Sequence, residues 1–286
     1  MENGKKGKLK FVFFGTPEVA AETLEILKAN GYWPSLIVTA PDARQGRGMQ
    51  MRESPAAIFA KKNNVPCLKP NKTDEEFSNK LKAMGYELFI VVAYGKILPE
   101  KILNLPKFGS INIHYSLLPK YRGASPVEAA ILNGEAETGV TVQKMAYKMD
   151  TGPIIAQKKV EILPKEKAPE LRSRLIKIGG ELLVKALSTP SASGTSPYVG
   201  GGWVGVSQDE SQATYCGKIE KEDGLIDLNG DPVKNYNKFR AYAEWPRTYF
   251  FQNGKRIIIT DAALEDNQFV IKKIIPEGKK ETAYKG

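Results

Sequence analysis

The sequence is short of the side chains that bind transition metals. It has one histidine, His114, and two cysteines in 286 residues. Cys67 and Cys216 lie far apart and form no CxxC pair, so their spacing favours neither a zinc site nor a disulfide framework. We therefore expect no bound metal ion.

Long hydrophobic runs are also lacking. The apolar run FIVVAY (89–94) is far shorter than the roughly 18 to 20 residues that a membrane-spanning helix needs. The lysine-rich start MENGKKGKLK leads into FVFFG without the apolar core and cleavage site of a secretory signal peptide. These features favour a cytoplasmic protein that does not contact a membrane.

Acidic side chains are in the minority. Lysine and arginine number 42 against 32 aspartates and glutamates, a net charge of +10, but residues 207–286 hold 13 of each sign. The whole basic excess therefore lies before residue 207. Such an excess points to a polyanionic partner such as a nucleic acid, although it is also common on an ordinary solvated surface.

Strand-like and helix-like stretches alternate through the first two-thirds of the chain. Residues 10–15 have the apolar character of a strand, and residues 18–31 place Ala20, Leu24 and Leu27 on one helical face. Further strands are expected at 35–40, 87–95, 110–116, 138–145 and 152–162, and further helices at 74–85, 126–134 and 168–187. The alternation predicts an α/β fold with a Rossmann-like, mostly parallel sheet and helices on both faces.

The composition changes after this region. Residues 189–208 are rich in serine, glycine and proline, which is typical of a linker. Beyond them, YFFQNGKRIIIT (249–260) predicts a β-hairpin with an Asn-Gly turn, and residues 267–275 supply another strand. We expect a first domain over 1–188, a linker over 189–208 and a small C-terminal β-barrel domain, OB-like, over 209–286.

Three polar side chains are candidates for catalysis. Asn112 and His114 are two residues apart in the strand expected at 110–116, so they point to the same face. An amide can bind a developing oxyanion, and a neutral imidazole can accept a proton from a nucleophile. Asp150, before a Gly-Pro turn, could orient the imidazole. This combination suits carbonyl chemistry.

A structural reading of the same residues stays open. Asn112 and His114 could be satisfied by nearby backbone groups, with Asp150 as a turn residue. No serine or cysteine nucleophile motif of the GxSxG kind occurs, so the pattern favours direct transfer over a covalent enzyme intermediate.

Longer stretches carry a family resemblance. NIHYSLLPKYRGASP (112–126), NGEAETGVTVQKM (133–145) and MDTGPI (149–154) closely resemble the folate-dependent formyltransferase family, which is identified by Asn-x-His, Ser-Leu-Leu-Pro and Asp-Thr-Gly. Within this family, FVFFGTPEVAAETL, PDARQGRG and QDESQATYCGKIEKEDGLID are similar to the members that act on methionyl-tRNA. The resemblance covers both expected domains.

The resemblance implies an activity. An enzyme of this kind transfers the formyl group of 10-formyltetrahydrofolate to the α-amino group of methionine on initiator tRNA, for translation initiation. Asn112, His114 and Asp150 match the family's catalytic residues. By that match, Asn112 would polarise the formyl carbonyl, His114 would transfer a proton, and Asp150 would orient His114.

Two short segments match the family's folate-binding parts, the Ser-Leu-Leu-Pro element and the end of the strand at 87–95. The residues implied are Ser116, Leu117, Leu118 and Pro119, together with the backbone groups of Val92, Ala93, Tyr94 and Gly95. The resemblance implies no membrane partner, and we expect a monomer.

A basic loop follows the second expected strand. PDARQGRGMQMRES contains Arg44, Arg47 and Arg52, and Arg47 matches the arginine with which the family grips the tRNA acceptor end. The guanidinium group suits this purpose because it pairs with phosphate oxygens and stacks on unpaired bases. Without the resemblance, the loop would be read as solvated surface.

Two other functions remain open at this point. One is N-formyl transfer to an amino sugar nucleotide, which the arginine loop and the tail QDESQATY disfavour. The other is a non-catalytic folate- or RNA-binding protein, which would not need Asn112, His114 and Asp150 together. Two features also depart from the family: the last 80 residues are charge-neutral, and the C-terminal domain is short.

Overall fold

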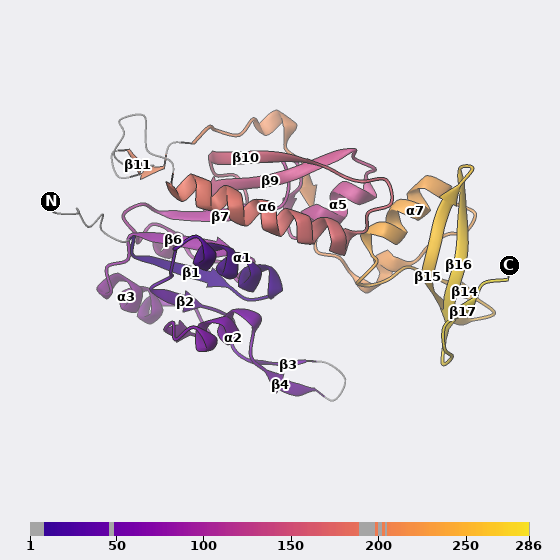
Figure 1. Ribbon diagram of the computed structural model, residues 1–286, viewed down its shortest axis with the longest axis horizontal. Helices are drawn as coiled ribbons and strands as arrows, with labels where there is room; N and C mark the ends of the chain where they lie inside the picture. The colour runs from indigo at the N-terminus through magenta and orange to yellow at the C-terminus, as the bar shows by residue number, and fades with distance from the viewer. Residues whose placement is uncertain (1–8, 46–48, 189–197, 200–201, 204, 286) are drawn as a thin grey trace. The chain divides into compact units, whose positions relative to one another are not determined.

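The computed structural model describes residues 9–45, 49–188, 198–199, 202–203 and 205–285 (Figure 1). The chain divides into two units, one made of 1–114, 140–158 and 176–209, the other of 115–139, 159–175 and 210–286. Among the described residues, no helix is both long and apolar enough to cross a membrane.

The central sheet has seven strands in the order β10-β9-β7-β6-β1-β2-β5. Neighbours from β7 to β5 pair in parallel, whereas β7 and β9 are antiparallel. The strands are β1 (Phe11–Gly15), β2 (Leu36–Val38), β5 (Cys67–Leu68), β6 (Leu88–Val92), β7 (Ser110–His114), β9 (Glu137–Lys144) and β10 (Ile154–Glu161). The predicted mostly parallel sheet is therefore confirmed.

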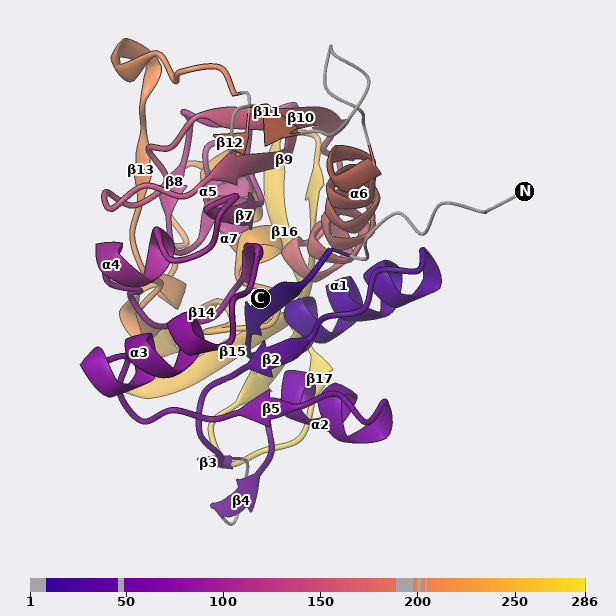
Figure 2. The same ribbon diagram turned by 90° about the vertical axis from the view of Figure 1, so that its left-hand side faces the viewer.

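Helices cover both faces of this sheet, which explains why its central strands are apolar throughout. All residues of β1 and β6 are buried. On one face, Phe14 and Val91 pack with Phe77 of α3 (Glu75–Ala83) and Ile102 of α4 (Glu100–Leu103). Figure 2 shows α1 (Glu18–Ala29), α2 (Pro55–Lys62) and the C-terminal half of α6 (Ala168–Ser188) on the other face.

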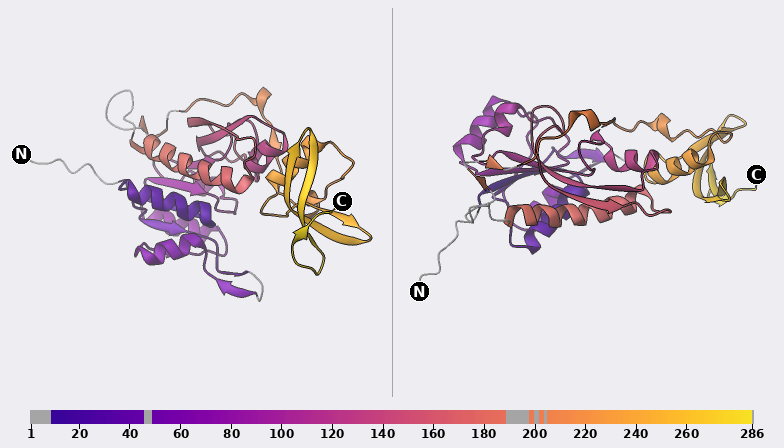
Figure 3. Two further views of the ribbon diagram at one scale, coloured as in Figure 1. Left: turned by 45° about the vertical axis from the view of Figure 1, so that its right-hand side comes forward. Right: turned by 90° about the horizontal axis from the view of Figure 1, so that it is seen from above.

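The C-terminal part is a small antiparallel β domain that also contains an α-helix (Figure 3). The sequence predicts an OB-like barrel here, and the described strands pair as a four-stranded sheet in the order β14-β15-β16-β17. The Asn253-Gly254 turn between the first two strands has positive φ at both residues, as expected for this hairpin. The strands are β14 (Tyr249–Gln252), β15 (Lys255–Glu265), β16 (Gln268–Pro276) and β17 (Thr282–Ala283).

Helix α7 (Pro232–Ala241) packs on this sheet and was not expected from the sequence. The Asp231 side chain caps it by accepting from two backbone N–H groups, and Tyr236 and Phe239 join a buried cluster with Ile257 and Ile259 of β15. The cap and this apolar face account for a helix in a region whose hairpin signal is otherwise dominant.

Several short elements complete the chain. They are α5 (Pro126–Leu132), β11 (Tyr198–Val199), β12 (Gly202–Trp203), and the 3-10 helices η1 (Glu210–Gln212) and η2 (Lys221–Gly224). β11 and β12, within the expected linker, form an antiparallel pair. Most of the remaining linker lies outside the described residues, so the domain limits expected from the sequence stay a prediction.

The loop after β7 is held by a segment far along the chain. β8 (Arg122–Gly123) pairs in parallel with β13 (Tyr215–Cys216), and the Tyr121 N–H donates to the Thr214 hydroxyl at 2.8 Å. Gly123 has a φ of +126°, and a Cβ there would overlap the carbonyl oxygen of Cys216. Glycine is required at this position because the backbones approach so closely.

This contact gives a stability prediction with a matched control. We expect Gly123→Ala to lower the free energy of unfolding by at least about 2 kcal/mol, because it adds both left-handed strain and a steric clash. Gly217→Ala is the control, since nothing lies within 4 Å of a Cβ at Gly217. Urea unfolding of both variants tests the prediction, and equal stability of the two would contradict it.

Candidate active site

The end of strand β7 presents two of the predicted site residues. Asn112 and His114 are alternate residues of β7, so their side chains share one face of the sheet. Asn112 is paired with Val91 of β6 on one side and with Gln143 of β9 on the other. The His114 side chain is buried, with 6% of its surface exposed.

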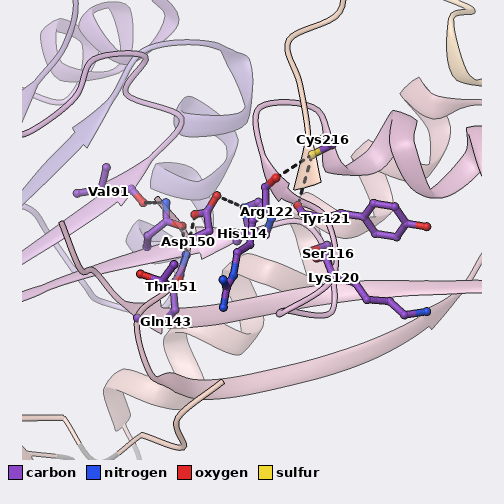
Figure 4. Close-up of polar contacts among 12 residues, drawn as sticks. Val91, His114, Ser116, Lys120, Tyr121, Arg122, Gln143, Asp150, Thr151 and Cys216 are labelled. Atoms are coloured by element: carbon purple, nitrogen blue, oxygen red, sulfur yellow. Dashed lines mark hydrogen bonds and ion pairs between the residues drawn. The ribbon is translucent and has the colours of Figure 1, made fainter. Parts of the chain in front are cut away.

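Asp150 reaches the same face from the loop after β9. Its Oδ2 lies 3.6 Å from His114 Nδ1, and both side chains are largely buried. Figure 4 shows the Asp150 carboxylate between His114 and Gln143. A carboxylate on this side of the ring favours the tautomer with a proton on Nδ1, which leaves Nε2 as the proton acceptor.

The backbone at Asp150 has an unusual conformation. Its φ is +55°, in the left-handed region that non-glycine residues rarely adopt. The Gln208 side chain donates to the carbonyl oxygens of Asp150 at 2.8 Å and Gly152 at 2.7 Å. These bonds stabilise the strained turn that presents the carboxylate.

The orientation of the Asn112 amide follows from its neighbours. Asn112 Nδ2 donates to the Val91 carbonyl oxygen at 3.0 Å, and Asn112 Oδ1 accepts from Gln143 Nε2 at 3.3 Å. The amide nitrogen carries a second hydrogen, which is the donor that an oxyanion would need.

Sequence reasoning missed Gln143 and Gln208. Gln143 has 2% of its surface exposed and lies in a strand whose other central residues are buried and mainly apolar. A polar residue inside a buried strand was the available signal, because a buried amide needs hydrogen-bond partners. Nothing in the local sequence indicated that Gln208 returns to the Asp150 loop.

The segment expected to line the folate pocket follows β6. Val92 and Tyr94 are buried, whereas Ala93 and Gly95 are exposed with positive φ. Both residues are therefore accessible to a ligand. Burial raises the pKa of Tyr94 to about 12, so its phenol stays protonated near neutral pH and does not act as a base there.

The Ser-Leu-Leu-Pro element follows β7 as a tight loop. The Ser116 side chain is fully buried and its hydroxyl donates to the Lys120 carbonyl oxygen at 2.6 Å. Leu118 is also buried, whereas Leu117 and Pro119 are partly exposed. Ser116 therefore shapes the loop, and the partly exposed residues are the ones that could contact a ligand.

The predicted arginine loop contains a short hairpin. β3 (Ala43–Gln45) and β4 (Gln50–Arg52) are antiparallel, with Arg44 opposite Met51 and Arg52 opposite Ala43. Arg44 and Arg52 therefore lie on opposite faces of the hairpin, and both are exposed. Arg47 lies outside the described residues.

Comparison with known proteins shows the family to which the chain belongs. A model of the formyl transferase family matches residues 9–187, and a model of the formyl transferase C-terminal domain matches residues 218–283. Methionyl-tRNA formyltransferase of Geobacter sulfurreducens is 37% identical over 87% of this chain and 76% of its own length. That of a Thermotoga species is 41% identical over 87% of this chain and 77% of its own.

Solved structures share the fold at lower identity. WlaRD, a sugar 3N-formyl transferase solved in the presence of dTDP and 5-N-formyl-THF, superposes with a TM-score of 0.66. The match covers 91% of this chain and 87% of that one, at 20% sequence identity. On the sequence identity and the two matched regions together, the chain belongs to the formyl transferase family, in the branch that holds the methionyl-tRNA formyltransferases.

Proposed function

We propose that this enzyme transfers the formyl group of 10-formyltetrahydrofolate to the α-amino group of methionyl initiator tRNA, at the start of translation. The observation that supports it most directly is the 37% to 41% identity to methionyl-tRNA formyltransferases over 87% of the chain. The arrangement of Asn112, His114 and Asp150 is consistent with that chemistry.

Asn112 is proposed to activate the formyl carbonyl group. When the amine attacks the formyl carbon, the carbonyl oxygen gains negative charge in the tetrahedral intermediate. The second hydrogen on Asn112 Nδ2 is donated to this oxygen, while the bond to Val91 keeps the nitrogen in place. A donor held before the charge develops stabilises the transition state because it does not need to reorganise.

His114 transfers the proton, and Asp150 stabilises its charged form. The attacking amine must lose one proton, and the departing folate nitrogen must gain one, so the net step consumes no proton. His114 Nε2 accepts the proton from the amine and returns it to the leaving nitrogen. Asp150, 3.6 Å from Nδ1, stabilises the imidazolium that exists between the two transfers.

The family resemblance indicates which segments hold the substrates. Exposed Ala93 and Gly95 suit the folate, as do the partly exposed Leu117 and Pro119. Exposed arginines of the β3–β4 hairpin suit the phosphates of tRNA. Because tRNA is the proposed acceptor, we expect the reaction to take place in the cytoplasm. We propose a catalytic domain in 1–188 and a tRNA-contacting domain in 209–286, and we expect the enzyme to be a monomer.

The acceptor is tested directly by supplying the enzyme and 10-formyltetrahydrofolate with purified methionyl-tRNA or with an amino sugar nucleotide. We expect formylation of methionyl-tRNA only. Transfer to the sugar alone would overturn the proposed acceptor, and binding of folate without transfer to either would overturn the proposed activity.

Substitutions of the three catalytic residues test the mechanism. Asn112→Ala should lower kcat about 100- to 1,000-fold, because an oxyanion donor is lost. His114→Ala and Asp150→Asn should lower it about 100- to 10,000-fold, the range for general acid–base catalysis. Asn133→Ala is a control, since Asn133 is exposed and its Nδ2 donates to the Ala129 carbonyl oxygen at the end of α5. Unchanged turnover in the folded His114→Ala variant would refute the mechanism.

The hairpin arginines are tested by the salt dependence of tRNA binding. Each of Arg44→Ala and Arg52→Ala should weaken binding and reduce the slope of log K against log salt concentration by about one, as loss of a phosphate contact does. The KM for the folate should not change. Lys82→Ala, exposed on α3, serves as the control. Slopes equal to that of the unchanged protein would rule these arginines out as phosphate contacts.

A further inference from the structure

Two glutamine side chains contact Asn112 and Asp150, two of the three proposed catalytic residues. Gln143 Nε2 donates to Asp150 Oδ1 at 2.8 Å and to Asn112 Oδ1 at 3.3 Å. Gln208 Nε2 lies 3.5 Å from Gln143 Oε1 and donates more closely to the Asp150 and Gly152 carbonyl oxygens. All these residues belong to one unit of the structure.

The position of Gln143 follows from the sheet. Gln143 of β9 is directly opposite Asn112 of β7, so both side chains project from the same face at contact distance. Gln143 is almost fully buried, and its amide is therefore held by its hydrogen bonds and not by water.

The direction of the Gln143 amide is fixed by what surrounds it. Nε2 faces two oxygen atoms, those of Asp150 and Asn112, and Oε1 faces the nitrogen of Gln208. A flipped amide would put Oε1 against both oxygens and Nε2 against a donor, which removes every bond. Networks of this kind determine amide orientation.

The hydrogen bonds of Asn112 determine the orientation of its amide in the same way. Asn112 Oδ1 accepts from Gln143 Nε2, and Asn112 Nδ2 donates to the Val91 carbonyl oxygen. If the Asn112 amide were flipped, its nitrogen would face the Gln143 nitrogen and its oxygen would face the Val91 oxygen, so both bonds would be lost. The direction is set by the Asp150 carboxylate, which only accepts, and it passes through Gln143 to Asn112. Asn112 is thereby held with its nitrogen, not its oxygen, available to the substrate.

The two oxygen atoms of the Asp150 carboxylate have different partners. Gln143 binds Oδ1, while Oδ2 is the atom nearest His114 Nδ1. The Asp150 backbone is supported by Gln208, and the nearby Val206 pairs with Ile154, the first residue of β10, through backbone bonds of 2.8 Å and 2.9 Å.

We infer that Gln143 is a positioning residue for formyl transfer: it fixes Asn112 as a hydrogen-bond donor and aims the Asp150 carboxylate at His114, while Gln208 holds the Asp150 turn. The role rests on the proposed function. Gln143 acts through the catalytic residues and does not itself contact the reacting atoms.

The test compares Gln143→Leu, which removes the amide at similar volume, with Gln143→Glu, which keeps the shape but replaces the donor with an acceptor. Both should lower kcat about 10- to 100-fold, the range for misplaced catalytic groups, while the KM values for folate and methionyl-tRNA stay within about threefold. Asn63→Leu is the control, because Asn63 is a partly buried amide that donates to the Phe59 carbonyl oxygen at the end of α2. The control should retain normal kcat.

A pH profile separates positioning from simple loss of structure. The ratio of the Gln143→Glu rate to the unchanged enzyme's rate should rise as pH falls, because a protonated carboxyl can donate one hydrogen bond again. Gln143→Leu has no titratable group, so its ratio should stay flat. A flat ratio in both variants would overturn the donor role.

Gln208→Ala gives a second route that does not disturb the buried strand, because Gln208 is only partly buried. It should lower kcat less than Gln143→Leu, and the double variant should be little worse than Gln143→Leu, since residues in one network are not additive. Unchanged kcat in the folded Gln143 variants, or a loss confined to KM, would overturn the inference alone. No turnover in the unchanged protein would overturn the proposed function.

Discussion

The register between β7 and β9 is the constraint on which the site depends. Asn112 opposite Gln143 puts both on the face that also holds His114. A slip of one residue would move Gln143 to the opposite face and leave Asn112 without this neighbour. The antiparallel direction also matters, because Lys144, where β9 ends, lies opposite Ile111 at the amino end of β7. The following loop must fold across the sheet face to bring Asp150 to His114.

Polar groups can be buried on that face because they form hydrogen bonds with each other. An unpaired buried amide or carboxylate costs about 1 to 3 kcal/mol, and more when charged. Gln143 is buried with two oxygen acceptors and one nitrogen donor around its amide. The cost of placing amides and a carboxylate away from water is therefore offset by bonds that also define their orientation. Stability and catalytic geometry depend on the same contacts.

The sequence predicted the elements with strong periodicity. Strands β1, β6 and β7 and helices α1 and α3 occur within a few residues of the predicted ranges, because their apolar spacing is regular. The pair Asn112 and His114 could be recognised from the sequence, because residues two apart in one strand point to the same face. Asp150 was reached through the family resemblance and a turn signal, not through geometry.

Other features depend on contacts that no local pattern encodes. Helix α2 is eight residues long and begins at the Ser54 cap, and its length gave too little periodicity to detect. The hairpin of β3 and β4 has an exposed β4, so it lacks the alternation of a half-buried strand. Gln143 and Gln208 acquire their role from a register and a returning segment, 65 residues apart in the chain. Such pairings are known only once the fold is known.

The segment QDESQATYC shows how a short polar stretch can be specified by bonds to distant backbone and side chains. Gln208 donates to two carbonyl oxygens of the Asp150 turn. Glu210 forms a two-pronged ion pair with Arg122, at 2.7 Å and 2.8 Å, and these hydrogen bonds are the main cause of the raised pKa of that arginine. The Arg122 side chain is 1% exposed, so lysine, which lacks the planar fork, could not reproduce this contact. Thr214 then accepts from the Tyr121 N–H. Three polar residues within seven positions each meet a different partner, which accounts for the composition of a stretch that has no periodicity of its own.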